Sequence, residues 1–341
     1  MNLKDIAKIA GVSSVTVSNV INGNHDKVSK ETIEKVQKII DENHYLPNAT
    51  ARSLASKESR IIGVVIPNLS EDEVFSVSPY NTQILALLEN YIRKQGYYLM
   101  MRCVGNCSEI IPVFSTWNVD GIIFFGAFPS EVEEIQSRIK VPTVFIDTYA
   151  EQLHIANVGI DDYKGGYLAT RYLLGKGHRQ IAFAGPGIDS PGVIHERYRG
   201  FCDACAERNV AVTTSHNFEA STIFDEGVEV GKKIAFSDQK FTAVTSMSDI
   251  LAFGIMEGLR RSGLNVPEDI SIVGFDNLPE CRYTNPQLTT VSQNLEQKAY
   301  LAGKYLFEMI REKKKIEVNE KVDVDLIERQ SVKAIPVPDK E

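Results

Sequence analysis

Small polar side chains near the amino terminus share a spacing that suits contact with the edges of bases. On an expected helix at about 100° per residue, five residues fall within one arc of roughly 140°: Ser14, Val15, Ser18, Asn19 and Asn22. The amide of Asn19 can pair with an adenine edge, and Val15 can pack on a thymine methyl group. Because bulky side chains would keep a helix away from the bases, this face favours a helix that enters the major groove of DNA.

Three expected helices would position this face. Apolar residues recur at helical spacing in residues 3–10, and Gly11 can end that helix in a left-handed conformation. Ser13 can cap the second helix and Ser29 the third, since a serine hydroxyl accepts a hydrogen bond from an unpaired backbone amide. Helical spacing alone is equally typical of any small helical bundle, so the choice depends on the sequence itself.

A series of short strings between residues 5 and 54 resembles the DNA-binding headpiece of the LacI/GalR family of bacterial transcription repressors. The strings are Asp5-Ile6-Ala7-Lys8-Ile9-Ala10-Gly11-Val12-Ser13, Thr16-Val17-Ser18, Val20-Ile21-Asn22-Gly23, Val28-Ser29, Thr32, Val36, Tyr45-x-Pro47-Asn48 and Ala51-Arg52-Ser53-Leu54. Many positions match at fixed spacing, which makes the resemblance more specific than a single short motif. It implies an all-α helix-turn-helix DNA-binding headpiece in residues 1–46, followed by a hinge helix or linker in residues 47–60.

The resemblance gives the second helix two kinds of contact with DNA. The family's base-reading positions correspond to Ser14, Val15 and Asn19. Contacts to phosphates, which position a helix without reading sequence, are expected from three hydroxyl groups: those of Ser13, Thr16 and Ser18. Asn22 completes the expected DNA-binding set on this helix.

In the hinge segment, the resemblance implies that Leu54 is wedged between central base pairs of the operator. An apolar wedge unstacks a base step and bends the duplex, which costs a few kcal/mol and allows further contacts. Without the flanking string, Leu54 would be interpreted as an ordinary core leucine. Arg52, in the same string, is expected to contact DNA as well.

The charge of the chain is divided between its two parts. The formal net charge is −8, which argues against a uniformly basic nucleic-acid binder. Residues 1–60 hold nine Lys and Arg and seven Asp and Glu, a net charge of +2, so the remainder carries −10. This division is typical of a DNA-binding domain on an acidic body. Lys4, Lys8, Lys30 and Arg52 are the basic residues best placed for phosphate contacts.

Other features of the sequence are typical of a cytoplasmic protein. Lys4, Asp5 and Lys8 interrupt the apolar region that a signal peptide would need. No stretch approaches the ~20 apolar residues that would span a membrane. The five cysteines are an odd number without a regular framework, which fits a reducing compartment. We therefore expect no membrane partner.

After residue 60, strand-like and helix-like segments alternate. The apolar run 61–66 is typical of a strand that is buried on both faces. Further strands are expected at 97–103, 119–125, 143–146, 181–184, 243–246 and 270–275, and helices at 84–94, 164–174, 198–208 and 250–262. Alternating strands and helices predict parallel sheets with right-handed crossovers, and two successive rounds predict two similar lobes.

A second series of strings resembles the effector-binding core of the same family. The strings are Val158-Gly159-Ile160-Asp161-Asp162, Gly165-Gly166, Ala169-Thr170-x-Tyr172-Leu173, Gly177-His178, Arg197-x-x-Gly200-Phe201, Gly274-Phe275-Asp276-Asn277, Pro286-x-Leu288-Thr289-Thr290-Val291 and Ile327-x-Arg329-x-Ser331. The resemblance implies an α/β core of two Rossmann-like lobes, similar to type I periplasmic binding proteins. This effector-binding and dimerisation core would occupy residues 61–341, with chain crossovers near 161, 290 and 322. The N-lobe would take about 61–161 and 291–322, and the C-lobe about 162–290 and 323–341.

Residues that directly follow strands are candidates for effector contact, because ligands of open α/β sheets bind at the carboxyl ends of strands. Asp147 and Asp276 follow expected strands, and Arg197 lies near the start of an expected helix. All three fall on effector-contacting positions of the family. A carboxylate accepts from hydroxyl groups and a guanidinium donates in a fixed fork, so this set suits a polyhydroxylated ligand.

The resemblance implies further effector contacts. Tyr80 and Asn81 match positions that face the ligand, although a helix start on the surface is an equal alternative. Ser248 and Asp249 stand where sugar-responsive members often have Asn-Asp, and Phe224 lies nearest to the aromatic residue that often stacks on the ligand. Tyr80-Asn81 differs from the paired aromatics of a purine-binding relative. We therefore expect a sugar or sugar derivative.

Motifs for other chemistry have simpler interpretations. Gly185-Pro186-Gly187 lacks the third glycine of a dinucleotide-binding turn, and Cys202-x-x-Cys205 lies within an expected helix without a second ligand pair. We expect no cofactor and no metal site. We also expect no enzymatic activity, because the sequence offers no constellation for nucleophilic, metal or phosphate chemistry.

The combined interpretation is a repressor that binds a pseudo-palindromic operator as a homodimer and responds to a small-molecule effector. The chain ends without a heptad tail, which favours a dimer over a tetramer. The alternative is a sugar-processing enzyme or a ligand-binding protein with an appended DNA-binding domain, since fold does not fix function. A transport binding protein would need an export signal.

Overall fold

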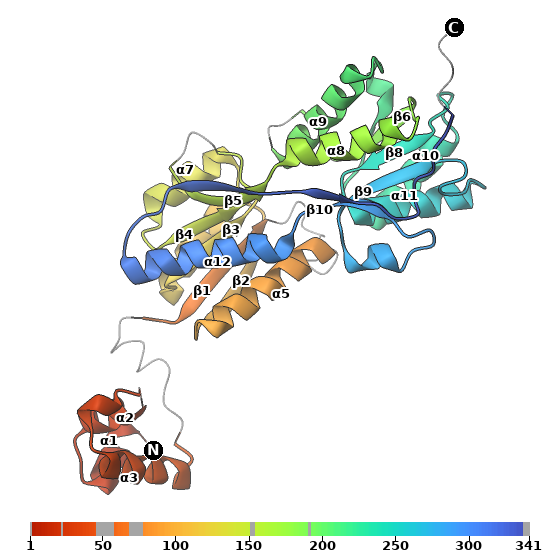
Figure 1. The fold of residues 1–341 in the computed structure, drawn as a ribbon. Coiled ribbons are helices and arrows are strands. Elements are labelled where there is room, and N and C mark those ends of the chain that lie inside the picture. Colours follow the sequence, from red (N-terminus) through yellow and green to blue (C-terminus); the bar gives the residue numbers. More distant parts are fainter. Residues whose placement is uncertain are drawn as a thin grey trace. The chain divides into compact units, whose positions relative to one another are not determined.

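In the computed structural model, the described residues of the amino-terminal unit, 1–60, form three helices and a short 3₁₀ turn. Across the whole chain the structure describes residues 2–21, 23–45, 58–67, 78–150, 154–189 and 192–336. The helices of the first unit are α1 (Leu3–Ala10), α2 (Ser14–Ile21) and α3 (Lys30–Glu42), with the 3₁₀ turn at His25–Lys27 (Figure 1). The expected three-helix headpiece is confirmed.

Side-chain caps define where the headpiece helices begin. The Asn2 side chain accepts hydrogen bonds from the amides of Lys4 and Asp5, at 2.9 and 3.1 Å, and the Asp5 carboxylate accepts from the Asn2 amide. Such a reciprocal pair satisfies amides that have no partner inside the helix. Gly11, at φ +65°, ends α1 in the left-handed region that glycine adopts most readily. The turn between α1 and α2 is therefore set by local sequence.

The headpiece has a small apolar core. Its buried members are Ile6, Ala7, Ala10, Val17, Val20, Val36 and Ile40. Each of the three helices contributes at least two of them, at helical spacing. Burying one aliphatic side chain contributes about 1.5–3 kcal/mol, so a cluster of this size stabilises the three helices only together.

The second unit, residues 61–341, contains two six-stranded sheets. The first sheet has the order β11-β5-β4-β3-β1-β2, and all of its neighbouring strands are parallel. Its strands are β1 (Ile61–Pro67), β2 (Tyr98–Val104), β3 (Gly121–Phe125), β4 (Thr143–Ile146), β5 (Ala156–Ile160) and β11 (Val318–Val322).

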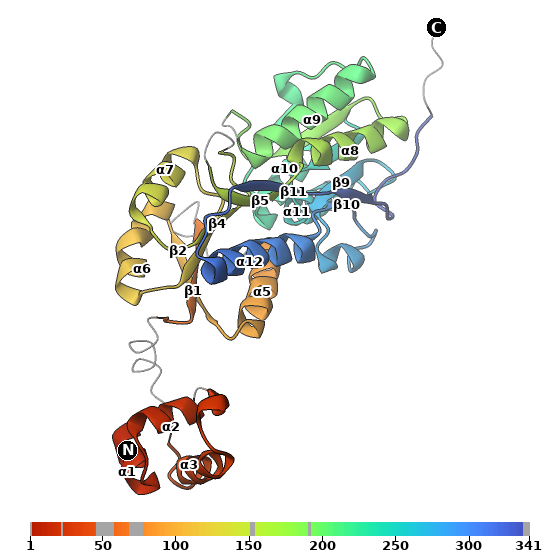
Figure 2. The same ribbon diagram turned by 60° about the vertical axis from the view of Figure 1, so that its left-hand side comes forward.

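Helices cover both faces of the first sheet. Figure 2 shows α5 (Pro79–Lys94) and α12 (Leu295–Glu312) on one side, and α6 (Ile111–Trp117) and α7 (Pro129–Arg138) on the other. Successive strand residues point to opposite faces, so Val64 packs with the α5 and α12 side while Val65 packs with the α6 and α7 side. Burial on both faces explains the continuous apolar runs of these strands. We call this sheet with its helices the first lobe.

The second sheet has the order β12-β10-β9-β8-β6-β7, with β12 antiparallel to β10. Its strands are β6 (Ile181–Gly185), β7 (Asn217–Glu219), β8 (Ala243–Ser246), β9 (Ser271–Asp276), β10 (Thr289–Ser292) and β12 (Asp325–Ile327). One face packs on α8 (Asp162–Gly175) and α9 (Val193–Glu207), and the other on α10 (Phe224–Ala235) and α11 (Asp249–Arg261). We call this sheet with its helices the second lobe.

The chain passes between the lobes three times. The passages follow Ile160 at the end of β5, Ser292 at the end of β10 and Val322 at the end of β11 (Figure 1). The second passage lies slightly beyond the expected crossover near 290, because β10 continues to pair with β9 up to Ser292. Each lobe is therefore built from segments that are distant in the sequence.

The expected helices of the core begin earlier than apolar spacing alone indicates. α5 starts at Pro79 rather than at residue 84, because Ser78 caps it and proline fits the first helical position. α9 starts at Val193, directly after Gly192, rather than at residue 198. The expected strands 143–146 and 243–246 match β4 and β8. Among the described residues, no helix combines the length and the apolar character needed to cross a bilayer.

Candidate functional site

The outer face of α2 is polar and accessible, with one exposed aliphatic residue. Val15 is 69% exposed, whereas Val17 and Val20 are buried in the headpiece core. The remaining polar residues of this face are half-buried: Ser14, Ser18 and Asn19. An exposed valine is costly in water, and it suits contact with a thymine methyl group. The structure thus places the expected base-reading residues on one accessible face.

Ser13 and Thr16 lie together at the start of α2. The Ser13 hydroxyl oxygen accepts from the Thr16 amide at 3.0 Å, and the two hydroxyl groups are 2.9 Å apart. This cap places both hydroxyls at the positive end of the helix dipole, which favours nearby phosphate. Asn22, Arg52 and Leu54, together with residues 47–57 of the expected hinge, lie outside the described residues.

In the core, two expected effector residues stand on unusual backbone at the ends of strands. Asp147 directly follows β4 with φ +54°, and Asp276 is the last residue of β9 with φ +121°. Non-glycine residues adopt such conformations at a cost of about 1–3 kcal/mol, and these conformations cluster at functional sites. The backbone therefore fixes the direction of both carboxylates.

These two aspartates and three side chains that connect them form what we call the polar network: Tyr80, Asp147, Asp276, Gln293 and Lys298. The Lys298 ammonium donates to both oxygens of Asp147, at 2.8 and 3.0 Å, to Gln293 Oε1 at 2.8 Å and to the Tyr80 hydroxyl at 3.1 Å. Tyr80 donates to Asp147 Oδ2 at 2.6 Å, and Gln293 Nε2 donates to Asp276 Oδ1 at 2.6 Å. The network joins α5, β4 and α12 of the first lobe to β9 of the second.

Arg197 centres a second group, the arginine network, with Asp162 and Tyr149. Arg197 Nε donates to Asp162 Oδ1 at 2.8 Å and Nη1 donates to the Met247 carbonyl at 2.7 Å, while the guanidinium lies 3.6 Å from the centre of the Phe275 ring. The Tyr149 hydroxyl donates to Asp162 Oδ2 at 2.5 Å. Arg197 and Asp162 are both buried, so each needs the other to offset the loss of hydration.

Close helix packing brings this pair together. Gly166 of α8 faces the Arg197 carbonyl of α9, and Gly200 of α9 faces the Tyr163 carbonyl of α8. A Cβ atom at either glycine would collide with the facing backbone. The two helices therefore approach closely only with glycine at these positions, and the contact sets Arg197 against Asp162 at the start of α8.

Burial raises the pKa of three carboxyl groups in this region. The pKa of Asp276 is raised to about 8 by burial and by the charge of Asp249, against the opposing effect of Arg197. Burial raises the pKa of Asp249 to about 6 and raises that of Asp162 despite the nearby Arg197. A carboxyl group that stays protonated near neutral pH can donate as well as accept a hydrogen bond.

The other expected effector residues lie apart from these networks. Asp249 is fully buried, and its oxygens accept from the Leu278 amide, the Cys281 thiol and the Thr290 hydroxyl. Ser248 caps α11 by accepting from the Leu251 amide. Two further expected residues stand at helix starts: Asn81, half-buried in the first turn of α5, and Phe224, 39% exposed at the first position of α10.

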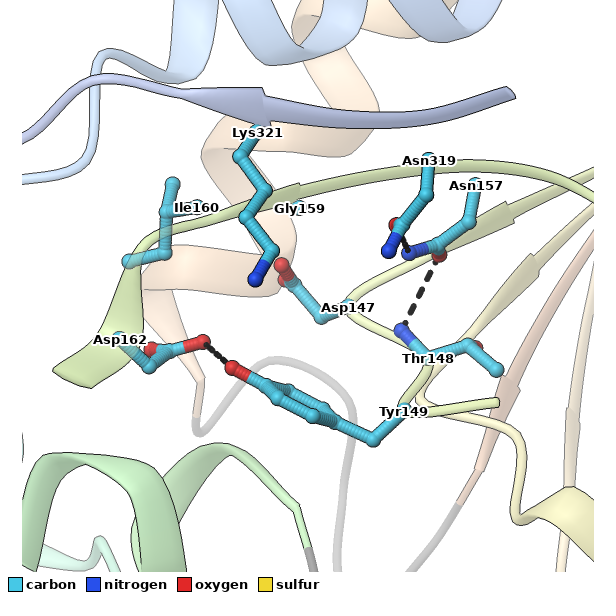
Figure 3. Close-up of a pocket in the computed structure, with 9 residues that line it drawn as sticks. All are labelled: Asp147, Thr148, Tyr149, Asn157, Gly159, Ile160, Asp162, Asn319 and Lys321. Carbon is cyan, nitrogen blue, oxygen red and sulfur yellow. Dashed lines mark hydrogen bonds between the residues drawn. The ribbon is translucent and has the colours of Figure 1, made fainter. Parts of the chain in front are cut away.

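A small cavity lies beside Asp147. Its volume is about 10 Å³, which is enough for about one water molecule. Figure 3 shows Asp147, Tyr149 and Asp162 around it, with the Lys321 side chain of β11 pointing toward Asp147. A larger cavity of about 290 Å³ lies next to it and shares Asn157 in its lining.

Sequence reasoning missed Lys298, Gln293, Asp162 and Tyr149 as members of this region. Lys298 had a usable signal, because it falls within the apolar stripe of α12: Leu295, Ala299, Ala302 and Leu306. A lysine inside such a stripe predicts a buried cation that needs a carboxylate partner. Gln293 has no comparable signal, since its role depends on two residues that meet it only in the fold.

Comparisons with known proteins agree with this architecture. Residues 2–48 match the lacI family of bacterial regulatory proteins, and residues 170–332 match a periplasmic binding protein-like domain. The HTH-type transcriptional repressor PurR of Vibrio campbellii is 33% identical over 343 residues, which cover 98% of this chain and 99% of that protein.

Two solved structures have the same fold. A crystal structure of the Lac repressor dimer bound to operator and the anti-inducer ONPF has a TM-score of 0.85 at 25% identity, covering 98% of this chain and 99% of that chain. A LacI family transcriptional regulator from Enterococcus faecium with bound ribose has a TM-score of 0.70 at 26% identity, covering 81% and 100%.

A helix-turn-helix headpiece joined to a two-lobed, periplasmic-binding-protein-like core defines a bacterial DNA-binding regulator with an effector-binding core. PurR and the Lac repressor are repressors of this class, and the Enterococcus faecium protein is a transcriptional regulator of it. The chain belongs to the lacI family of bacterial regulatory proteins, and it is a transcriptional repressor of that family.

Proposed function

We propose that this repressor works as a homodimer whose two headpieces bind the two halves of a pseudo-palindromic operator. The accessible face of α2 supports this proposal, because helix-turn-helix dimers place one recognition helix in each of two successive major grooves. The Lac repressor, which has the same fold, was solved as a dimer on its operator. DNA binding by a bacterial regulator supports the cytoplasm as its site of action.

Each DNA-binding residue has a proposed task. Ser14, Val15 and Asn19 read base edges, while three hydroxyl groups of the helix contact phosphates: those of Ser13, Thr16 and Ser18. Asn22 and Arg52 add further contacts to the duplex. Residues 47–60 act as the hinge between headpiece and core, and Leu54 inserts between central base pairs, where an apolar wedge stabilises a bent duplex.

The effector site proposed here consists of the polar network and the arginine network. The single observation that carries the proposal is that Tyr80, Asp147, Arg197 and Asp276 meet around buried charges at the carboxyl ends of strands, between the two sheets. Carboxylates and a guanidinium suit hydroxyl groups, which favours a sugar or sugar derivative. The Enterococcus faecium relative was solved with ribose.

Binding of this effector changes the angle between the lobes. The cavity beside Asp147 has a volume of about 10 Å³, too small for a sugar, so a ligand there requires the lobes to separate. Asn81, Phe224 and Ser248 lie at helix starts and would join the site in that conformation. Asp249 acts on the site indirectly, because its charge raises the pKa of Asp276. Linkage then requires effector and operator to change each other's affinity by the same factor.

The proposal is tested first by selection of bound duplexes from a random DNA pool, at a stated salt concentration because phosphate contacts make affinity salt-dependent. A two-fold symmetric site is the expected result. Recovery of no preferred sequence, with or without pooled metabolites, would contradict operator binding by this headpiece.

The selected duplex then serves as the probe for effectors. Neutral sugars and their derivatives are added singly, and the operator affinity of the full chain is measured by fluorescence anisotropy. At least one compound should change that affinity, and Asp276→Asn should reduce its influence while leaving the basal operator affinity in place. A change that persists undiminished in the Asp276→Asn variant would show that the effector binds elsewhere.

A further inference from the structure

Lys298 is a buried cation inside the proposed effector site. Its side chain is 0% exposed, and its three N–H groups are engaged by Asp147, Gln293 and Tyr80. A buried lysine of this kind needs a carboxylate partner, because an unpaired buried charge is strongly destabilising. Asp147 supplies that partner, and its own side chain is 16% exposed.

The charges around Asp147 come from several elements. Lys298 donates to it from α12, and Tyr80 donates a hydroxyl hydrogen from α5. The Lys321 side chain of β11 points toward it (Figure 3). Lys321 is exposed, so water and salt screen its charge, whereas the charge of Lys298 acts without that screening. The buried ammonium is therefore the group that balances Asp147 inside the site.

We propose that Lys298 determines the charge of the effector, so that the site accepts an uncharged polyhydroxy compound and rejects an analogue that carries an ammonium group. The inference rests on the proposed function of this site as the effector site. It adds that selectivity for the charge of the effector comes from Lys298, which does not have to contact the sugar ring.

This selectivity follows from the acceptor positions of Asp147 and the nearby charges that a ligand would meet. An ionised carboxylate offers about four acceptor positions, and Tyr80 and Lys298 do not occupy all of them on Asp147. A ligand hydroxyl can use what remains. A ligand ammonium would instead lie close to Lys298 and Arg197, and like charges in a desolvated interface cost several kcal/mol.

Asp276 does not offer an alternative partner for a cation. Its Oδ1 atom already accepts from Gln293, whose carbonyl oxygen accepts from Lys298. Burial and the charge of Asp249 raise the pKa of Asp276 to about 8, so this group is largely neutral at pH 7. Two further carboxyl groups lie in the region. Asp162 is paired with Arg197, and Asp249 accepts hydrogen bonds from the Leu278 amide, the Cys281 thiol and the Thr290 hydroxyl. Every carboxyl group of the region other than Asp147 thus has an ion-pair partner, a hydrogen-bond donor or a proton inside the protein.

The test uses the full chain and matched pairs of probes: glucose with glucosamine, and galactose with galactosamine. Binding is measured by isothermal titration calorimetry. The wild-type protein should prefer the neutral member of a pair by about tenfold or more. Lys298→Met keeps the length of the side chain but leaves Asp147 without its buried cation, so the preference should shift toward the amino sugar by a similar factor.

Three further variants define what the shift means. Lys321→Met removes an exposed charge facing the same carboxylate and should keep the wild-type order, and Lys304→Met, on the exposed side of α12, should change nothing. Asp147→Asn with Lys298→Met removes both charges and should restore the neutral preference. A Lys298→Met variant that keeps the wild-type order, or a Lys321→Met variant that shifts equally, would overturn the proposal.

A second measurement decides the matter even if no probe sugar binds to the wild-type chain. Lys298→Ala removes three carbons and the ammonium group, which propylammonium can replace. Propylammonium chloride should raise the thermal midpoint of Lys298→Ala above the value in equal sodium chloride, and should not raise that of Lys304→Ala. No difference between the salts would refute a cation site at Asp147. If the wild-type chain binds no sugar but Lys298→Ala responds to propylammonium, the cation site at Asp147 stands, and only the proposal of a sugar effector is contradicted.

Discussion

The headpiece and the proposed effector site hold their polar groups in opposite ways. The caps that organise α1 and α2 join residues two or three positions apart, and these hydrogen bonds are exposed. The polar network joins residues up to 218 positions apart, and Lys298 at its centre is fully buried. In the headpiece, the groups proposed to bind DNA lie on a surface, whereas in the core the groups proposed to bind the effector lie in the packed interior.

Substitutions in the headpiece can therefore change binding without changing stability, whereas substitutions in the core change both. Exposed groups such as Val15 can be replaced without leaving a buried group unpaired. Buried groups such as Arg197 cannot, because removing one partner leaves the other without hydration or a counter-charge. The four predictions below test this contrast, from the largest expected effect to the smallest.

Arg197→Met should destabilise the core by about 3–5 kcal/mol, because it leaves the buried Asp162 carboxylate without its ion-pair partner. Urea unfolding of the full chain, monitored by far-ultraviolet circular dichroism, measures the change in the free energy of unfolding. The double variant Asp162→Asn with Arg197→Met should recover part of the loss. A loss below about 1 kcal/mol, as for exposed ion pairs, would show that the pair is not held as a buried one.

Asp276 should make the stability of the core depend on pH. Its pKa is raised from 3.8 to about 8, so the folded state binds more protons than the unfolded state between these values. The contribution of this group to stability is therefore complete below about pH 4 and is lost as pH rises through about 8.

Asp276→Asn lacks this titration, so thermal midpoints measured from about pH 5 to pH 8 should fall less steeply in the variant than in the wild type. Asp269→Asn, an exposed carboxylate of the same lobe, is the control and should follow the wild-type slope. Parallel curves for wild type and Asp276→Asn would contradict the raised pKa.

Asn19→Ala should relax the preference for one symmetric pair of operator bases by about 1–3 kcal/mol, which is the worth of a good contact to a base edge. The thermal midpoint should stay unchanged, because Asn19 lies on the accessible face of α2. Binding to operators substituted at each position measures the change. A uniform loss on all sequences would assign Asn19 to a phosphate instead.

Ser13→Ala should lower the stability of the headpiece by about 1 kcal/mol, the usual cost of removing a serine cap, since the Thr16 amide loses its acceptor. Amide hydrogen exchange in residues 14–21 of the full chain measures this effect. Exchange in the core should stay the same. An equal increase in both units would mean that the cap does not act locally.

The headpiece and the strands of the core could be predicted from sequence because their signals are local. Ser13, Ser29 and Gly11 mark helix ends by themselves, and the apolar run 61–66 is sufficient for a buried strand. Similarly, Asp147 and Asp276 could be chosen because each stands at the carboxyl end of a strand. Their positions needed no knowledge of a partner.

The partners of these aspartates could not be predicted in the same way. Lys298 meets Asp147 across 151 positions, and Gln293 meets Asp276 across 17 positions that include a whole strand. Asp249 follows a strand and fits the family pattern, but its oxygens are occupied by Leu278, Cys281 and Thr290. Local position identifies a carboxylate, and only packing decides whether that carboxylate faces a ligand or the protein.

The three passages of the chain between the lobes also govern the order in which the repressor can be completed during synthesis. The three described headpiece helices end by residue 42, so they can fold before the core, which begins at residue 61, is made. The first sheet lacks an edge until β11 is made, and the second lacks one until β12 follows it. Both lobes therefore become complete almost together, between residues 318 and 327, so a nascent chain can carry a folded DNA-binding headpiece well before it carries the complete core.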